Sequence, residues 1–399
     1  MDCHAKLRIK NECQPILKAK KTITVVCLTI IWISSCLYDF YKHSICLFGK
    51  KVFILQNNTY GITLNSISRM DILDEVRWGF IGCGEVTEKK SGPAFSMIEG
   101  SKVVAVMSRD KDKVRSYAER HHIPKYYTDA QSLIADKDVN AVYIATPPSS
   151  HATFAIMAMK AGKPVYVEKP MAVSYEECLR INRVSAMEEV PCFVAYYRRY
   201  LPYFQKVSEL LRNDVIGKVL NVQLRFAVPP RELDYHSDNL PWRLQPDIAG
   251  GGYFYDLAPH QIDLLQLYFG SIIEAEGYCS NRANMYKVED TISACFRFDS
   301  GLPGSASWCF VAHQSARTDR IEIVGQKGMI CFSVYDYTPI ALHTEEGRKE
   351  IIVENPKYVQ LPIITDVVEH LRGITVCACD SMSATPTNWV LDKILGKLG

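Results

Sequence analysis

From Glu75 to Tyr200, short apolar runs alternate with amphipathic stretches of helical periodicity. The apolar runs are VRWGFIG, KVVAVMSR, VNAVYIAT, PVYVEKP and PCFVAYYRR. Strands that are apolar on both faces and alternate with helices indicate a parallel sheet that is covered on both sides. We therefore predict an N-terminal α/β domain over residues 73–196, with the doubly wound parallel sheet of the Rossmann type.

After Tyr200 the pattern changes to strands joined by glycine-containing turns. These strands are GKVLNVQLRFAV, TISACFRFDSG, GSASWCFVA, RIEIVGQKGMICFSVYD and PIALHT. Such a succession predicts a large, mainly antiparallel sheet, and the main helix expected beside it covers Asp256 to Phe269. Residues 197–399 are thus expected to form a C-terminal α+β domain.

The segment 1–72 resembles neither domain. Residues 18–37 combine lysines with a 16-residue apolar run, which is slightly shorter than the roughly 17 to 25 residues that span a bilayer. A basic lead and a short apolar stretch are also typical of a signal peptide. Met70 precedes the first strand by a few residues, so we favour an upstream misreading of the start and a cytoplasmic protein. The alternative is membrane anchoring or export through residues 18–37.

Composition narrows the function classes. The chain has 399 residues and a net charge of +2 from 46 basic and 44 acidic residues, so it lacks the basic excess that nucleic-acid partners require. Its 14 cysteines include Cys192 and Cys295, which lie singly in apolar runs, as small core hydrophobes do. We expect a reducing compartment, no disulfide framework and no metal site.

The stretch GFIGCGEVT, Gly79 to Thr87, carries the first chemical motif. Gly82-x-Gly84 directly after a strand gives a tight turn and lets backbone N–H groups approach a pyrophosphate. The third position of this fingerprint, usually Gly or Ala, is Thr87. An ordinary glycine turn would look the same locally, but the strand before it and the alternating elements after it favour a dinucleotide.

The end of the next strand bears on the choice of cofactor. An acidic residue there would bind the ribose hydroxyls of NAD, but the chain has Ser108 and Arg109, and Asp110 is expected to cap the following helix. Arg forms charge-assisted, often bidentate hydrogen bonds to phosphate. We predict a preference for NADP(H), with NAD(H) possible and a solvated Arg109 as the alternative interpretation.

Two further loops follow strands at the edge where open α/β sheets bind ligands. Thr146 and Pro147 lie in ATPPSSHATF, where His151 is interpreted chiefly as a structural residue. Glu168 and Lys169 follow PVYV, and a lysine there would stabilise charge that develops on a substrate oxygen during hydride transfer. A surface lysine in a turn is an equally weighted alternative.

The stretch AGGGYFYDLAPHQIDLL places Asp256, His260 and Asp263 on one helical stripe. Carboxylates beside an imidazole can orient its tautomer and move protons. Pro259 fits this arrangement if the helix begins at about Asp256, since proline is tolerated in a first turn. Asp256 would then also be the N-cap.

GCGEVT, EKP and GGGYFYDLAPH, in this order, resemble the Gfo/Idh/MocA oxidoreductases, and the resemblance covers Glu75 to the C-terminus. It implies that Lys169 binds the reacting hydroxyl or carbonyl, that His260 is the general acid and base, and that Asp256 orients the substrate. Expected substrate contacts besides these are Arg198 or Arg199, Trp242 and Arg243. The candidate cofactor contacts are Gly82, Cys83, Gly84, Glu85, Val86, Ser108, Arg109, Thr146, Pro147, His151, Glu168 and Lys169.

The function expected from these features is hydride transfer between NAD(P) and a sugar-like or cyclitol CH–OH group. Two alternatives stay open: a redox-assisted, NAD-dependent glycoside hydrolase and a nucleotide-binding sensor without turnover. The resemblance also implies a homodimer or homotetramer that buries one face of the second sheet, where we place Trp308 and Phe310. Nucleic acid is not an expected partner. A membrane is expected as a partner only if residues 18–37 are an anchor.

Overall fold

The computed structural model describes residues 43–48, 51–58, 61–67, 72–236, 238 and 240–398. The chain divides into two compact units, Met1–Ile72 and Leu73–Gly399. In the first unit, an antiparallel sheet that the sequence patterns did not predict consists of β1 (His43–Phe48), β2 (Lys51–Asn58) and β3 (Gly61–Ile67). The apolar run behind the anchor interpretation lies outside the described residues. No helix in the described ranges is long and apolar enough to cross a membrane.

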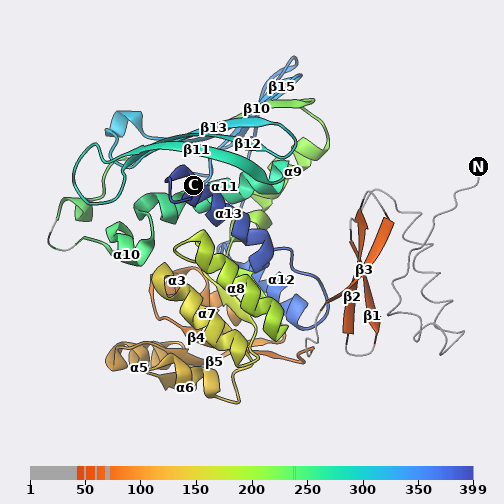
Figure 1. Cartoon of the computed structure of the whole chain (residues 1–399), viewed down its shortest axis with the longest axis vertical. Coiled ribbons are helices and arrows are strands. Elements are labelled where there is room, and N and C mark those ends of the chain that lie inside the picture. Colours follow the sequence, from red (N-terminus) through yellow and green to blue (C-terminus); the bar gives the residue numbers. More distant parts are fainter. Residues whose placement is uncertain are drawn as a thin grey trace, which may run out of the picture. The chain divides into compact units, whose positions relative to one another are not determined.

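The second unit begins with the predicted parallel sheet (Figure 1). Its strand order is β6-β5-β4-β7-β8-β9, and all neighbouring strands are parallel. The order reverses between β4 and β7, which creates the switch point where such sheets bind ligands. The strands are β4 (Val76–Ile81), β5 (Ser101–Met107), β6 (Lys125–Tyr127), β7 (Ala141–Ile144), β8 (Val165–Val167) and β9 (Cys192–Val194).

Side-chain caps fix the starts of several helices around this sheet. The carboxylates of Asp110 and Asp129 and the hydroxyl of Ser174 each accept a hydrogen bond from a backbone N–H of the first turn, which satisfies a donor that has no partner within the helix. The expected capping role of Asp110 is thus confirmed. The helices are α3 (Glu85–Lys89), α4 (Gly92–Phe95), α5 (Lys111–Arg120), α6 (Ala130–Ala135), α7 (His151–Lys160) and α8 (Tyr175–Glu188).

The Asp110 cap gives a first stability prediction. Asp110→Ala is expected to lower the free energy of unfolding by about 1 kcal/mol, because the backbone N–H of Lys113 loses its acceptor at 3.0 Å. Denaturant unfolding followed by circular dichroism measures this change. The control is Asp112→Ala in the same turn, where an exposed pair with Arg115 is removed and a change of about 0.5 kcal/mol or less is expected. Equal losses in both variants would contradict the capping argument.

The second sheet has eight strands in the order β11-β12-β13-β10-β14-β15-β16-β17. Its neighbours are antiparallel except β10 and β13, so the predicted mainly antiparallel sheet is confirmed. The sequence patterns missed β11 and β17. The strands are β10 (Val219–Ala227), β11 (Ile272–Ser280), β12 (Thr291–Phe298), β13 (Pro303–Cys309), β14 (Thr318–Gly325), β15 (Gly328–Phe332), β16 (Ile340–Thr344) and β17 (Gly347–Ile351).

One face of this sheet packs on helices, and α11 and α13 lie between it and the parallel-sheet domain (Figure 1). Trp308 belongs to the packed face, because its ring contacts Phe254 at 4.9 Å and its Nε1 donates to Gln261. Phe310 is buried as well. Assigning Trp308 and Phe310 to an oligomer face was therefore wrong, since both are core residues. The helices of this part of the chain are α9 (Pro202–Arg212), α10 (Pro246–Ala249), α11 (Gly252–Phe269), α12 (Leu361–Leu371) and α13 (Ser381–Ile394).

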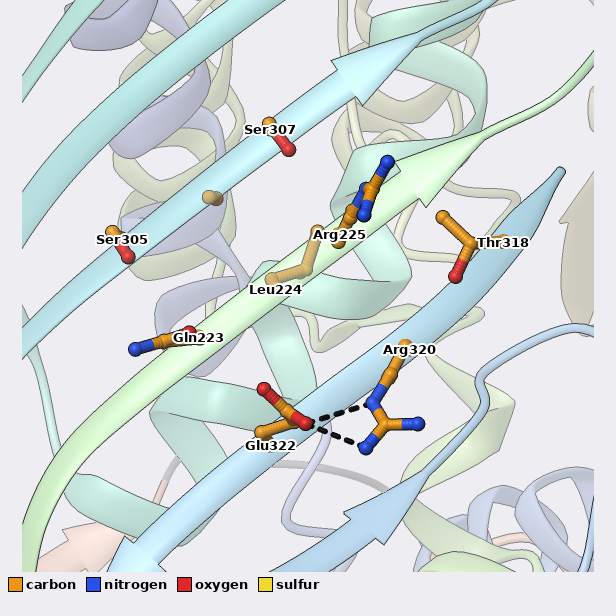
Figure 2. Close-up of a pocket in the computed structure, with 9 residues that line it drawn as sticks. Gln223, Leu224, Arg225, Ser305, Ser307, Thr318, Arg320 and Glu322 are labelled. Atoms are coloured by element: carbon orange, nitrogen blue, oxygen red, sulfur yellow. Dashed lines mark hydrogen bonds and ion pairs between the residues drawn. The ribbon is translucent and has the colours of Figure 1, made fainter. Parts of the chain in front are cut away.

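The opposite face of the sheet is polar. Figure 2 shows a pocket on β13, β10 and β14, and the polar side chains that line it are Gln223, Arg225, Ser305, Ser307, Thr318, Arg320 and Glu322. Cys295 pairs in register with Ser305 and is exposed on this face, whereas Cys192 is buried. The core placement expected for Cys295 was wrong because every second residue of β12 points outward.

Helix α11 begins at Gly252, four residues before the expected start. Gly252 has a φ of +62°, a left-handed backbone that favours glycine. Pro259 therefore lies inside the helix, and Asp256 is not its N-cap. Pro259 removes the hydrogen bond to the carbonyl of Tyr255, and the next two carbonyl oxygens, of Asp256 and Leu257, accept hydrogen bonds from side chains outside the helix.

Candidate active site

Lys169 reaches from the parallel sheet to helix α11. It follows the buried strand β8 and a glutamate, at the carboxyl edge of the sheet. Its Nζ donates to the backbone oxygen of Asp256 at 2.6 Å and to the Oδ1 of the same residue at 3.0 Å. Both side chains are less than one fifth exposed. The ammonium is thus held in one place by two oxygens of α11.

Asp256 is clamped between two cations. Its Oδ2 accepts a hydrogen bond from Nε of Arg243 at 2.8 Å, while Oδ1 faces Lys169. Burial by itself would raise the pKa of Asp256, but Lys169 and Arg243 outweigh burial and hold this pKa well below its usual range. The guanidinium of Arg243 stacks over Trp242 at 4.4 Å. Asp256 is therefore a permanent carboxylate that orients Lys169.

His260 lies one helical turn after Asp256. It is buried, its ring packs edge-on against Tyr197 at 4.8 Å, and its Nδ1 has no hydrogen-bond partner in the part of the chain that is described. Burial, followed by the nearby charges of Arg198, Lys169 and Lys90, holds the pKa of His260 well below 6.5. At neutral pH the imidazole is uncharged and can accept a proton.

The two consecutive arginines before α9 have different surroundings. Arg199 forms an ion pair with Asp263 at 2.5 Å, so Asp263 belongs to a packing contact and not to the group around His260. Arg198 is 4% exposed, donates to the carbonyl of Val334 at 3.1 Å and lies 4.5 Å from the centre of the Tyr335 ring. Of the two candidates, Arg198 is the one beside His260.

The glycine turn between β4 and α3 fits a dinucleotide. Gly82 has a φ of +114°, and a Cβ on it would lie 2.7 Å from the carbonyl oxygen of Ala145, so the turn requires glycine there. At Gly84 no atom of the described residues, its two chain neighbours aside, lies within 4 Å of the position of a Cβ, so the backbone borders open space. Cys83 points inward, with its Sγ on the carbonyl of Met107, whereas Glu85 is exposed.

Ser108 and Arg109 lie where the ribose of a dinucleotide is expected. They follow β5, next to β4 in the sheet, and Arg109 is exposed. The Ser108 hydroxyl accepts a hydrogen bond from the backbone N–H of Asp110 at 3.4 Å. The Asp110 carboxylate caps α5 and is therefore occupied by the helix. The exposed guanidinium of Arg109 in the same loop can bind a ligand.

Two further candidate cofactor contacts, His151 and Glu168, form hydrogen bonds within the protein. The ring nitrogens of His151 lie 2.8 Å from the carbonyl oxygen of Thr146 and 3.0 Å from that of Pro170. Glu168 accepts hydrogen bonds from the hydroxyl of Tyr143 at 2.6 Å and from Gln360 at 2.7 Å. At the candidate site, His151 thus ties the loops after β7 and β8 together, and Glu168 links the loop after β8 to β7 and to the residue before α12. Thr146 and Pro147 stay at its surface, half-buried and exposed respectively.

Sequence reasoning missed several residues that shape the site. The rings of Tyr197 and Tyr335 both contact the Arg198 guanidinium, and the Tyr335 hydroxyl donates to the carbonyl of Leu257. The charge of Lys90 helps to lower the pKa of His260. Gln360 supports Glu168 from the far end of the chain. None of these residues lies in a recognisable motif, and only the packing of distant segments reveals them.

Comparison with known proteins defines the class. Residues 76–196 match the oxidoreductase family with an NAD-binding Rossmann fold, and residues 204–331 match the GFO/IDH/MocA C-terminal domain. The chain therefore belongs to the GFO/IDH/MocA oxidoreductases, and the expected family, fold class and dinucleotide-dependent enzyme class are confirmed.

Individual relatives agree with this assignment. Oxidoreductase P35 of Formosa agariphila is 38% identical over 80% of this chain and 98% of its own length. Myo-inositol 2-dehydrogenase of Thermotoga maritima is 28% identical over 69% of this chain and 80% of its own length. The structure of a levoglucosan dehydrogenase with NADH and levoglucosan matches with a TM-score of 0.72, at 22% identity, over 81% of this chain and 96% of that one.

Proposed function

We propose that the protein oxidises a secondary alcohol of a sugar-like or cyclitol molecule, or reduces the corresponding ketone, with NAD(P) as the hydride carrier. The observation that carries this proposal is that α11 fixes the ammonium of Lys169 at Asp256, one turn before His260, a buried and uncharged imidazole whose pKa Lys169 helps to lower. A glycine turn that fits a dinucleotide follows β4. Relatives that are named for myo-inositol and levoglucosan support a polyhydroxylated substrate.

The residues divide the work as follows. Lys169 donates a hydrogen bond to the reacting oxygen and stabilises the negative charge that develops on it. His260 accepts the hydroxyl proton during oxidation and returns it during reduction. Asp256 and Arg243 hold Lys169 in place, and Trp242 supports Arg243. The bound nicotinamide supplies the hydride chemistry, and the candidate residues from Gly82 to Val86, with Thr146 and Pro147, would hold the dinucleotide.

The initial test uses the full chain. It is mixed with NAD⁺ or NADP⁺ and a panel of polyols, or with NADPH and sugar ketones, and the absorbance of the reduced nicotinamide is followed. Net formation or consumption of NAD(P)H supports the dehydrogenase. Cleavage of a glycoside without net nucleotide consumption would indicate the redox-assisted hydrolase. Dinucleotide binding without turnover of any polyol would favour the sensor.

Arg109 carries the cofactor preference that we propose, NADP(H) over NAD(H). Arg109→Gln is expected to weaken NADPH binding about 10- to 100-fold, since a hydrogen bond to a charged group contributes about 1.5 to 3 kcal/mol, and to leave NADH binding nearly unchanged. Fluorescence titration measures both affinities. Arg183→Gln, at an exposed position of α8, is the control. Tighter binding of NADH than NADPH by the unmodified chain would refute the preference.

We keep the homodimer or homotetramer that the family resemblance implies as a proposal, and we place its interface on the polar outer face of the large sheet. Gln223, Arg225 and Arg320 are exposed side by side on β10 and β14 (Figure 2), where a second copy of the chain could cover them. Sedimentation equilibrium of the full chain tests this proposal. A monomer at micromolar concentration would argue against it.

A further inference from the structure

Arg198 is a buried cation. Its Nε and one Nη donate to two neutral groups, the carbonyl of Val334 and the hydroxyl of Tyr197. Its guanidinium also lies over the rings of Tyr197 and Tyr335, at 4.9 and 4.5 Å. Within the described ranges no carboxylate forms an ion pair with it. Burying an uncompensated charge costs several kcal/mol.

The neighbouring residue provides an internal comparison. Arg199 follows directly in the chain and its side chain is 11% exposed, yet both Oδ atoms of Asp263 accept hydrogen bonds from it, at 2.8 and 2.5 Å. Among the residues that the structure describes, Asp263 therefore pairs with the arginine in the packing contact, and no carboxylate pairs with the arginine beside His260. That difference points to a ligand as the source of the missing negative charge.

The charged side chains of the candidate site near Arg198 are mostly cationic, and the carboxylate of the adjoining loop, Asp319, accepts hydrogen bonds from the backbone N–H groups of Val334 and Tyr335. Lys169 and Arg243 share a single carboxylate, that of Asp256. With His260 uncharged, the group formed by Lys169, Arg243, Arg198 and Asp256 carries a net positive charge of two. A group of this charge attracts anions, and it binds them more strongly once water is displaced.

The position of Arg198 beside His260 indicates that the ligand that pairs with it is the substrate and not the cofactor. Tyr197 packs against both Arg198 and His260, and Tyr335 bridges from Arg198 to the carbonyl of Leu257 in α11. These contacts place the guanidinium among Tyr197, Val334 and Tyr335, which belong neither to the glycine turn nor to the loop of Arg109. A neutral sugar would leave this charge without a partner.

We propose that the substrate of the dehydrogenase carries a carboxylate that pairs with Arg198, so that the enzyme acts on polyhydroxy acids such as uronic, aldonic or cyclitol acids. This inference rests on the proposed function and narrows its substrate class. Planar carboxylate and guanidinium groups match in geometry, and Arg198 adds charge-assisted hydrogen bonds to the Lys169 and His260 contacts of the reacting alcohol.

The test compares substrates that differ in one group. The full chain is assayed with NAD(P)⁺ on the pairs glucuronate and glucose, and galacturonate and galactose, and on glucose 6-sulfate. We expect kcat/KM for the acids to exceed that of the neutral sugars at least tenfold, with the sulfate ester below the acids. Equal or better turnover of the neutral sugars would overturn the inference and leave the dehydrogenase intact. Absence of turnover on every polyol, acid or neutral, would instead reject the proposed function.

Substitution tests the residue itself. In Arg198→Gln the ratio of kcat/KM for glucuronate to that for glucose is expected to fall about 10- to 100-fold, and Arg198→Lys should retain part of it. Arg212→Gln, at an exposed position of α9, should leave the ratio unchanged. An unchanged ratio in Arg198→Gln would overturn the assignment of Arg198 to the substrate carboxylate. Weaker binding of NADPH by Arg198→Gln than by the unmodified chain, measured without sugar, would also overturn it. If the variants fail to fold, the comparison of acids and neutral sugars on the unmodified chain decides.

Discussion

Replacing Lys169 by methionine is expected to lower kcat about 10²- to 10³-fold, the usual loss when one preorganised donor to a developing oxyanion is removed. Methionine keeps the length of the side chain but lacks the ammonium that Asp256 holds in place. The loss should appear in kcat more than in KM, because the hydrogen bond strengthens as charge develops on the substrate oxygen. Steady-state kinetics in both reaction directions measures it.

Two controls make this result specific. Lys160→Met changes a lysine that is exposed in the last turn of α7, and it should leave kcat within twofold. NADPH titration of Lys169→Met should still show binding, since the glycine turn and Arg109 are unchanged. A variant that retains a tenth or more of wild-type kcat would remove Lys169 from the chemical step.

Replacing His260 by asparagine should lower the rate of alcohol oxidation about 10²- to 10⁴-fold, the range for loss of a general base. In the wild type, the pKa of His260 is held below 6.5 by burial and by neighbouring cations. The imidazole is therefore a competent base at neutral pH, and the acid limb of the pH profile of kcat should lie below pH 6.5. The residual activity of His260→Asn should lack this limb.

A stability measurement separates the base from a packing residue. The unfolded chain protonates His260 more readily than the folded protein, so the contribution of this residue to stability is present above pH 6.5 and is lost as pH falls below it. His260→Asn should thus lose less stability than the wild type between about pH 7 and pH 5.5. His313→Asn, in an exposed loop, serves as the control for both measurements. An acid limb that persists in His260→Asn would assign it to another group.

Local patterns of the sequence determined the framework of this protein. Apolar runs between amphipathic helices specified a parallel sheet, because such strands must be buried on both faces, and the turn at Gly82 follows from backbone sterics that only glycine tolerates. The same logic located Lys169 at the carboxyl edge of the sheet and His260 on a helix of the second domain. These features depend on neighbours in the chain, which a sequence displays directly.

Tertiary structure decided what these residues meet. Nothing local shows that Arg243 and Lys169 share the carboxylate of Asp256, that Glu168 turns toward Tyr143 and Gln360, or that Trp308 faces the helices. Nor does the pair of arginines at 198 and 199 reveal which one has a carboxylate partner. Burial and charge pairing depend on segments far apart in the chain, so the chemistry of the site became definite only when these segments packed together.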